Sequence, residues 1–334
     1  MSTSVFVSGA TGFIAQHIIK LLLSKGYSVV GSVRSAAKGD HIKQLFGSDA
    51  FTYEIVPDLE APGAFDQALK NHPEVTVFLH TASPVKLKVS NIEAELLQPA
   101  VEGTNNVFKA IQLYGPQIKK VVVTSSVAAS MEISRFKDPS YTISETTKNP
   151  ITWEESKSDP FLGYLGSKTY AEKAAWDFIN QESPSYELNV TNPSYVFGPQ
   201  AFDSEVKDEL NLSSEIINGL LKLTPDSEVP DIFGAFIDVR DVAKAHVAAF
   251  ESNFSNERLL LTSETFTAQT IIDILAEKFD SFKGKLPVAK SDDAYNSGAA
   301  YDNQKTRELL GFPFIDLKTS VVDSVVQILK ARED

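Results

Sequence analysis

Short apolar segments rich in β-branched residues alternate with longer segments of helical periodicity through the first 200 residues of this 334-residue chain. The apolar segments are nearly continuous in hydrophobic residues, which is typical of strands covered on both faces. Their alternation with helical segments predicts βαβ units, and therefore an α/β fold built on a doubly wound parallel sheet. We expect strands at 4–9, 28–34, 51–56, 76–82, 120–126 and 188–198, and helices at 13–24, 64–71, 92–113 and 163–180.

The pattern changes after residue 198, where helix-rich segments with Pro and acidic residues follow. Residues 233–250 are interpreted as a short strand that runs into a helix and returns the chain to the sheet. We therefore predict a first domain of residues 1–200 with 236–262, and a smaller, discontinuous second domain of residues 201–235 with 263–334.

The composition narrows the range of functions. A formal net charge of −13, without a Lys/Arg block, argues against nucleic acid or an anionic membrane as a partner. The apolar runs are too short to cross a bilayer, the start MSTS lacks the cationic residues of a signal peptide, and cysteine is absent. We expect a cytoplasmic protein without disulfides and, because the five His are scattered, without a metal site.

A glycine-rich turn follows the first predicted strand. The segment VSGATGFIAQHI places Gly9, Gly12 and Ala15 at three-residue intervals, directly before a predicted helix. Glycine allows a tight turn and a close approach of backbone N–H groups to a pyrophosphate, and a small third residue lets the helix pack near the strand. The turn therefore predicts a dinucleotide site in the first domain.

The end of the second predicted strand indicates which dinucleotide binds. An NAD site needs an acidic residue about 20 residues beyond the glycine turn, which accepts hydrogen bonds from the ribose 2′-hydroxyl. Here the segment SVRSAAK places Arg34 at that point and Lys38 one helical turn later. Because a guanidinium pairs with a 2′-phosphate that a carboxylate would repel, we predict NADPH as the cofactor. Asp58 and Leu59, after the third strand, are expected near the adenine.

Two Tyr-x-x-x-Lys pairs occur, Tyr164 with Lys168 and Tyr301 with Lys305. The first pair opens a helix that precedes the sixth predicted strand, within reach of a cofactor, whereas the second lies far outside the nucleotide-binding half. At positions i and i+4 of a helix both side chains project from one face. A nearby lysine cation is expected to lower the pKa of the phenol toward a value useful near neutral pH, which would provide a proton donor for a reduction.

A third polar group is expected at the carboxyl end of the fifth predicted strand, where doubly wound sheets expose ligand-facing side chains. The segment KVVVTSSVAAS carries Thr124, Ser125 and Ser126 at this point. A hydroxyl there would polarise a substrate carbonyl, and the pattern leaves open which of the three points inward.

These motifs, together with LHTASPV, NPSYVFGPQ and FIDVRDVAKAH, follow one order along essentially the whole chain, which resembles the extended short-chain dehydrogenases/reductases. Within them it is similar to the dihydroflavonol-reductase-like branch and to the yeast NADPH-dependent methylglyoxal and carbonyl reductases. The resemblance implies Ser126 as the carbonyl-polarising hydroxyl, Tyr164 as general acid and Lys168 as the cation at the nicotinamide ribose. It implies that the cofactor contacts Gly9, Gly12, Phe13, Ile14, Arg34, Lys38, Asp58, Leu59, Thr81, Ala82, Ser83, Pro193 and Ser194.

The resemblance also implies a reaction in which aldehydes and ketones are reduced to alcohols, with NADPH as hydride donor and Tyr164 as proton donor. The first domain would bind the dinucleotide and the second the substrate. Related reductases often carry a large aromatic residue where Val85 stands, so the pocket here is expected to be wider. Candidate pocket walls are Val85, Ile133, Phe161, Leu162, Tyr195 and Phe202, for which ordinary core packing is an equally good interpretation.

Two other functions fit the same motifs. A sugar-nucleotide epimerase or dehydratase uses the same Ser/Tyr/Lys set but retains NAD, and Arg34 argues against NAD. A non-catalytic NADPH-sensing protein would not need all three catalytic residues. The physiological substrate stays open among small dicarbonyls such as methylglyoxal, branched aldehydes and bulkier ketones, and we expect a monomer or a homodimer.

Overall fold

The computed structural model describes residues 3–83, 89–289 and 295–333. The chain divides into two compact units. Unit 1 comprises Met1–Glu132, Glu145–Asn192 and Ala243–Leu259, and unit 2 comprises Ile133–Ser144, Pro193–Val242 and Leu260–Asp334. Four segments that the sequence pattern groups with the first domain fall in unit 2, namely residues 133–144, 193–200, 236–242 and 260–262.

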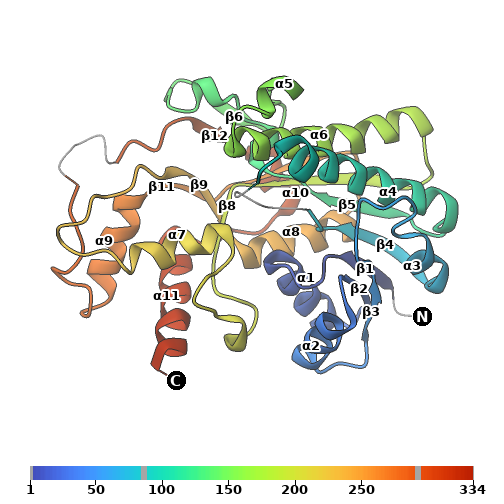
Figure 1. The fold of residues 1–334 in the computed structure, drawn as a ribbon, viewed down its shortest axis with the longest axis horizontal. Helices are drawn as coiled ribbons and strands as arrows, with labels where there is room; N and C mark the ends of the chain where they lie inside the picture. Colours follow the sequence, from blue (N-terminus) through green and yellow to red (C-terminus); the bar gives the residue numbers. More distant parts are fainter. Residues whose placement is uncertain (1–2, 84–88, 290–294, 334) are drawn as a thin grey trace. The chain divides into compact units, whose positions relative to one another are not determined.

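Unit 1 is built on a seven-stranded sheet with the strand order β10-β7-β5-β4-β1-β2-β3 (Figure 1). The paired strands from β3 across to β7 run parallel. The predicted doubly wound parallel sheet is therefore confirmed, and the strand order reverses between β1 and β4, where such sheets bind ligands. The strands are β1 (Ser4–Ser8), β2 (Ser28–Val33), β3 (Phe51–Ile55), β4 (Val75–His80), β5 (Lys120–Thr124), β7 (Glu187–Pro193) and β10 (Arg258–Leu261).

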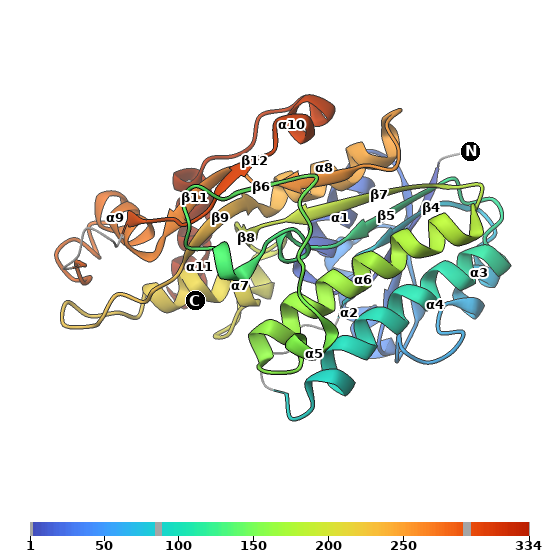
Figure 2. The ribbon, with the colours of Figure 1, turned by 90° about the horizontal axis from the view of Figure 1, so that it is seen from above.

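Helices cover both faces of this sheet. Helices α4 and α6 lie side by side along β4, β5 and β7 (Figure 2), whereas α1 and α2 lie on the other face (Figure 1). Under α3 and α4, the rings of Phe6 and Phe78 stack at 4.8 Å, and Phe65 packs edge-on against both. The helices are α1 (Phe13–Ser24), α2 (Ala36–Phe46), α3 (Asp66–Asn71), α4 (Gln98–Tyr114), α5 (Trp153–Ser156), α6 (Pro160–Glu182) and α8 (Val239–Glu251).

Two predicted helices differ from the observed ones for local reasons. The predicted helix 92–113 is interrupted, because a π-helical turn (Glu93–Leu97) precedes α4 and Pro99, at its start, has no N–H to donate to the preceding turn. Helix α6 begins three residues before the predicted 163, because Asp159 caps it and Pro160 occupies its first position.

The predicted single strand 188–198 is wrong. It consists of β7 and of β8 (Tyr195–Phe197), which belong to different sheets and are separated at Ser194. Pro193 has no N–H with which to continue the ladder of β7. The expectation that residues 233–250 return a strand to the large sheet is also wrong, since β9 (Phe233–Asp238) pairs with β8 and the seventh strand is β10.

Unit 2 contains a three-stranded sheet in the order β11-β9-β8 and a two-stranded sheet of β12 and β6. Its core gathers the rings of Phe197, Phe236 and Phe266 against apolar residues of α7, α9 and α11. None of the helices in the described parts of the chain is long and apolar enough to span a membrane. The remaining elements are β6 (Thr142–Ser144), α7 (Leu212–Leu220), β11 (Glu264–Thr267), α9 (Ala268–Lys278), β12 (Ala300–Asp302), α10 (Gln304–Leu310) and α11 (Leu317–Glu333).

Candidate active site

The turn between β1 and α1 leaves the first backbone N–H groups of α1 open to a ligand. Gly9 has a φ of +70°, and a Cβ at this position would lie 3.0 Å from the Cα of Ala82, so the turn requires glycine. Gly12 is the N-cap of α1 and has no side chain that could occupy the N–H groups of Phe13 and Ile14. This end of the helix suits an anionic group, because its N–H groups and its dipole both favour negative charge.

Arg34 and Lys38 project from one short turn at the carboxyl end of β2. Arg34 follows the strand directly, Lys38 lies in the first turn of α2, and both side chains are exposed. Ser35 fixes the turn by accepting a hydrogen bond from the backbone N–H of Lys38. Two cations on a capped turn provide the charge that a phosphate monoester requires.

The turn after β3 is held against α4. Nδ2 of Asn106 donates to the carbonyl oxygens of Leu59 and Ala61 at 2.9 and 3.0 Å. The Leu59 side chain lies over Gly103, where a Cβ would come within 1.8 Å of its Cδ1. Asp58 is exposed, and its Oδ1 accepts from the Glu60 N–H at 2.9 Å. Leu59 therefore presents a fixed apolar surface beside an exposed carboxylate.

The segment after β4 is anchored through Ser8. The N–H groups of Thr81 and Ala82 both donate to Ser8 Oγ at 3.0 Å, and Ser8 Oγ lies 2.9 Å from Nδ1 of His80. With two N–H groups on its oxygen, the Ser8 hydroxyl donates to Nδ1, which assigns the proton of His80 to Nε2. Burial, followed by the charge of Lys168, lowers the pKa of His80 to about 4, so the ring is neutral. Val85 lies outside the described residues.

The three hydroxyls at the end of β5 have three different partners. Thr124 Oγ1 lies 2.7 Å from Nε2 of His246, and Ser125 Oγ donates to Oε2 of Glu172 at 2.5 Å. The hydroxyl of Tyr164 donates to Ser126 Oγ at 3.4 Å. Thr124 and Ser125 are thus hydrogen-bonded to residues other than Tyr164. The geometry therefore identifies Ser126 as the hydroxyl beside Tyr164.

Tyr164 and Lys168 lie one turn apart on α6, and burial shifts the pKa of both side chains. Burial lowers the pKa of Lys168 to about 8. Burial also raises the pKa of Tyr164, against the opposing effect of the hydrogen bond with Ser126. The expected lowering of the tyrosine pKa is therefore wrong for this structure, because desolvation of the phenolate outweighs the hydrogen bond with Ser126.

The second Tyr-x-x-x-Lys pair has a different geometry. Tyr301 lies on β12, whereas Lys305 lies on α10, so the two residues do not share a helix face. The hydroxyl of Tyr301 is hydrogen-bonded to the backbone of Ala235 in unit 2, and burial raises its pKa. The spacing in this pair is a coincidence of sequence.

A small cavity connects several predicted cofactor residues with Lys168. Its volume is about 20 Å³, which is room for one water molecule. Its lining includes Leu59, Ala82 and Ser83 as well as Lys168, Ser125 and Glu172. The structure thus brings the turns after β3, β4 and β5 together around one lysine.

The predicted substrate residues are divided between the units. Phe161 and Leu162 belong to the first turn of α6 in unit 1, where their N–H groups donate to the capping Asp159, and Phe161 is 45% exposed. Ile133, Tyr195 and Phe202, like the predicted cofactor residues Pro193 and Ser194, belong to unit 2.

Within unit 2, Ser194 is buried, and both its N–H and its Oγ bind the carbonyl of Leu261 at 3.1 Å. The Tyr195 ring packs edge-on against Phe266 at 5.4 Å, so part of this residue serves the core.

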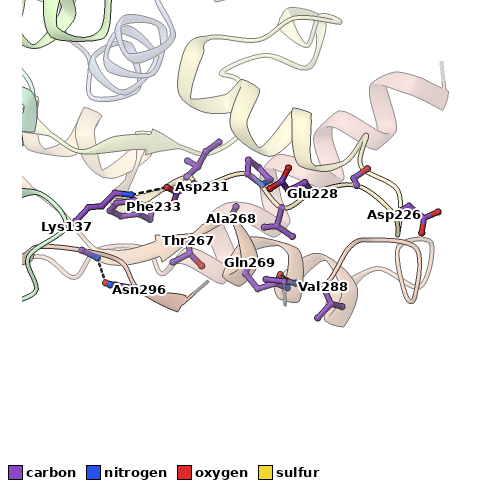
Figure 3. Close-up of a pocket in the computed structure, with 16 residues that line it drawn as sticks. Lys137, Asp226, Glu228, Asp231, Phe233, Thr267, Ala268, Gln269, Val288 and Asn296 are labelled. Atoms are coloured by element: carbon purple, nitrogen blue, oxygen red, sulfur yellow. Dashed lines mark hydrogen bonds and ion pairs between the residues drawn. The ribbon is translucent and has the colours of Figure 1, made fainter. Parts of the chain in front are cut away.

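A much larger pocket, of about 860 Å³, lies within unit 2 (Figure 3). Lys137 and Asp231 form an ion pair at 3.1 Å at one end, and Asp226 and Val288 lie toward the other. None of the described residues that line it is a predicted site residue. Size alone therefore does not identify the reactive site. In the described parts of the chain, no group of three or more His, Asp or Glu could hold a metal ion.

Sequence reasoning missed two residues that contact the segment around Ser126, Glu172 and Arg258. Glu172 accepts from Ser125 and forms an ion pair with Arg258, whose Nε lies 2.6 Å from Oε1. The spacing carried a signal for Glu172, which follows Lys168 by one helical turn on the same face. No local pattern marks Arg258, 86 residues further along the chain.

The fold and the Ser/Tyr/Lys arrangement define a class of protein that the sequence comparison identifies. A match to the NAD dependent epimerase/dehydratase family covers residues 5–260, and the chain belongs to this family. The predicted resemblance to the extended short-chain dehydrogenases/reductases is confirmed.

Individual relatives are similar along their whole length. The chain is 55% identical over 337 residues to GRP2 of Candida albicans, covering 98% of this chain and 99% of that protein. It is 46% identical over 336 residues to the NADPH-dependent methylglyoxal reductase GRE2 of Saccharomyces cerevisiae, with 98% of each chain covered. A crystal structure of the yeast methylglyoxal/isovaleraldehyde reductase Gre2 complexed with NADPH matches with a TM-score of 0.96 at 44% identity, covering 99% of both chains.

Proposed function

We propose that this protein is an NADPH-dependent carbonyl reductase that converts aldehydes and ketones to alcohols. The observation that carries the proposal is the contact of 3.4 Å between the Tyr164 hydroxyl and Ser126 Oγ, in the same unit as Lys168 and the Gly9 turn. Two hydroxyl donors at one point can bind a carbonyl oxygen together. The names of the yeast relatives describe the same activity.

NADPH would bind along the carboxyl ends of the strands in unit 1. The proposal rests on the open N-terminus of α1, the close approach of Gly9 to Ala82 and the exposed cations after β2. When bound, the cofactor supplies a hydride to the carbonyl carbon. We assign Gly9, Gly12, Phe13 and Ile14 to the pyrophosphate, Arg34 and Lys38 to the 2′-phosphate, Asp58 and Leu59 to the adenosine, and Thr81, Ala82, Ser83, Pro193 and Ser194 to the rest of the cofactor.

The side chains of the protein would handle the oxygen and its proton. Ser126 donates a hydrogen bond to the carbonyl oxygen and stabilises the negative charge that develops there. Tyr164 then transfers its proton to that oxygen, and its raised pKa keeps it protonated until the charge has developed. Lys168, with a pKa of about 8, is mostly cationic at neutral pH and stabilises the phenolate that remains.

The substrate class follows from the relatives and the proposed walls. We propose small dicarbonyls such as methylglyoxal and branched aldehydes such as isovaleraldehyde as first candidates, with bulkier ketones next. The names of the yeast relatives support the first two. The proposed walls are Val85, Ile133, Phe161, Leu162, Tyr195 and Phe202.

Neither the epimerase nor the sensor is favoured, because the GRE2 relative of Saccharomyces cerevisiae is named an NADPH-dependent reductase and the yeast Gre2 structure is a complex with NADPH. We further propose action in the cytoplasm, since a sequence without cysteine suits a reducing compartment, as a monomer or homodimer.

The proposal is tested by following NADPH and NADH absorbance with methylglyoxal, isovaleraldehyde and an aryl ketone. We expect turnover with NADPH that is lost in Tyr164→Phe and retained in Tyr301→Phe. A wild-type protein that binds NADPH without oxidising it across this panel would contradict the proposal and favour a sensor. Tightly retained NAD in the purified protein would favour an epimerase.

A further inference from the structure

A buried carboxylate one helical turn beyond Lys168 holds the segment that carries Ser126. Glu172 is 5% exposed. Its Oε2 accepts from Ser125 Oγ at 2.5 Å and from Asn192 Nδ2 at 2.7 Å. Its Oε1 accepts from Arg258 Nε at 2.6 Å and from Trp176 Nε1 at 3.3 Å. Four donors on one buried carboxylate fix its orientation from every side.

Arg258, on β10, extends this network to the backbone. Its Nη1 donates to the carbonyl oxygens of Glu145 and Thr147 at 2.7 and 2.6 Å. Its Nη2 donates to Ser130 Oγ at 2.8 Å and to the carbonyl of Ala129 at 3.5 Å. The guanidinium therefore ties α6 to the turn that follows Ser126 and to the 145–147 segment, all within unit 1.

Two links connect Glu172 to Ser126. The first is the bond to Ser125, the neighbouring residue. The second runs through Asn192, whose Nδ2 also donates to the carbonyl of Ser126 at 3.1 Å. Asn192 is 1% exposed, and its Oδ1 has no hydrogen-bond partner among the described residues, so these two bonds are what hold its amide. The backbone of Ser126 is thus fixed on both sides, while its Oγ accepts from Ala128 N–H and faces Tyr164.

We propose that Glu172, oriented by Arg258, is a positioning residue that sets the Ser126 hydroxyl relative to Tyr164. The inference rests on the carbonyl reductase proposed above. Glu172 does not touch the reacting atoms in this proposal. It acts by holding Ser125 and Asn192, and a small displacement of Ser126 would misalign the donor that must meet the developing alkoxide.

The test is a pair of double-mutant cycles, because a general loss of stability must be separated from an effect through Ser126. Glu172→Gln keeps the shape of the side chain but removes its charge and one acceptor. We expect kcat to fall about 10- to 100-fold, with the NADPH dissociation constant changed less than about twofold. In a Ser126→Ala background the same substitution should have almost no further effect on kcat.

A matched control is Asp238→Asn in unit 2. Asp238 is fully buried and pairs with Arg240 through two bonds of 2.8 Å. Both residues belong to unit 2 and lie far from Ser126 in the sequence, whereas Ser126 belongs to unit 1. The Asp238→Asn variant should have a lower melting temperature but should not show the loss of kcat that depends on Ser126. If Glu172→Gln leaves Arg258 too poorly paired to fold, Ser125→Ala carries the test, since it removes one link and leaves the ion pair intact. We expect that variant to lose about three- to tenfold in kcat, again only when Ser126 is present.

The outcomes are distinct. An equal loss of kcat with and without Ser126 would show a merely structural role and overturn the inference, as would Glu172→Gln or Ser125→Ala enzymes with wild-type kcat. A wild-type protein without NADPH-dependent turnover would overturn the proposed function, and the inference with it. Loss of kcat that depends on Ser126, at unchanged NADPH affinity, supports the positioning role.

Discussion

Tyr164→Phe and Tyr301→Phe remove the same oxygen atom from two tyrosines that stand in the same sequence spacing, yet we expect opposite consequences. The Tyr164 hydroxyl donates one hydrogen bond of 3.4 Å, to Ser126. This is at the long end of hydrogen-bond geometry, so its loss should cost no more than about 0.5 kcal/mol of stability. A well-placed general acid, in contrast, contributes about 10²- to 10⁴-fold to the rate. Tyr164→Phe should therefore lose catalysis and keep its fold.

For Tyr301→Phe we expect a loss of stability and no loss of catalysis. Its desolvated hydroxyl is bonded to the backbone of Ala235, on the central strand of the three-stranded sheet of unit 2. Removing it leaves a backbone group without its partner, at a cost of about 1–3 kcal/mol. For a chain of this size the melting temperature should fall by several degrees, roughly 2–4 °C for each kcal/mol.

The assay measures kcat and KM with methylglyoxal, the NADPH dissociation constant by fluorescence and the melting temperature, for both variants beside the wild type. We expect kcat to fall at least about 10²-fold in Tyr164→Phe, with NADPH affinity and melting temperature nearly unchanged. Tyr301→Phe should keep kcat within about twofold of wild type and melt at a lower temperature. Equal losses of kcat in the two variants would refute the assignment of the proton donor, and so would turnover retained by Tyr164→Phe.

Three further predictions follow from the proposed cofactor site. Arg34→Glu should weaken NADPH binding about 10- to 100-fold, because a charge-assisted bond is replaced by repulsion, while NADH affinity changes little; titrations showing the same ratio for both cofactors would exclude a 2′-phosphate site at Arg34. Gly9→Ala should cost about 1–2 kcal/mol from its φ of +70° alone and weaken NADPH binding as well, since its Cβ would press on Ala82; unchanged melting and affinity would contradict the tight turn. Burial lowers the pKa of Lys168 from 10.5 to about 8, so the unfolded chain binds more protons between these pH values and the stability of the free protein should rise with pH across this window. Lys168→Met should remove that rise in thermal melts and stabilise the protein at neutral pH by up to about 3 kcal/mol while turnover falls, and a variant less stable than wild type would contradict the burial argument.

The elements that could be predicted from sequence are those whose signal is local. Helix α1 begins and ends at the predicted residues because its apolar periodicity is strong and a glycine precedes it. Helix α2 was not predicted, although Ser35 and Gly47 are standard helix ends, because only Gly39 and Ile42 of this helix are buried and its apolar face is too narrow to stand out. The division of 188–198 into two strands depends on which sheet each half joins, and that information lies in the distant partners of β7 and β8.

The residues proposed for catalysis show even more clearly that local sequence signals are not sufficient. The spacing of Tyr164 and Lys168 was sufficient to place both on one helix face, but the direction of the tyrosine pKa depends on burial, which spacing does not contain. The choice among Thr124, Ser125 and Ser126 likewise depends on His246 and Glu172, residues from other elements that engage the first two hydroxyls.

The charged pair behind Ser126 explains why sequence pattern fails at this point. Sequence patterns predict Glu and Arg at the surface. In addition, a protein with a buried ion pair is often no more stable than one with apolar residues in its place. In this protein the ion pair of Glu172 and Arg258 serves orientation in our proposal. Apolar contacts let side chains slide past one another, whereas the hydrogen bonds from Arg258 through Glu172 to Ser125 define angles as well as distances. In our proposal, charged side chains are buried here, against the usual preference for the surface, because the Ser126 hydroxyl must be held within a fraction of an ångström of one position. The loss of kcat in Glu172→Gln, measured with and without Ser126, therefore tests two statements: that Glu172 positions Ser126, and that the buried ion pair serves orientation.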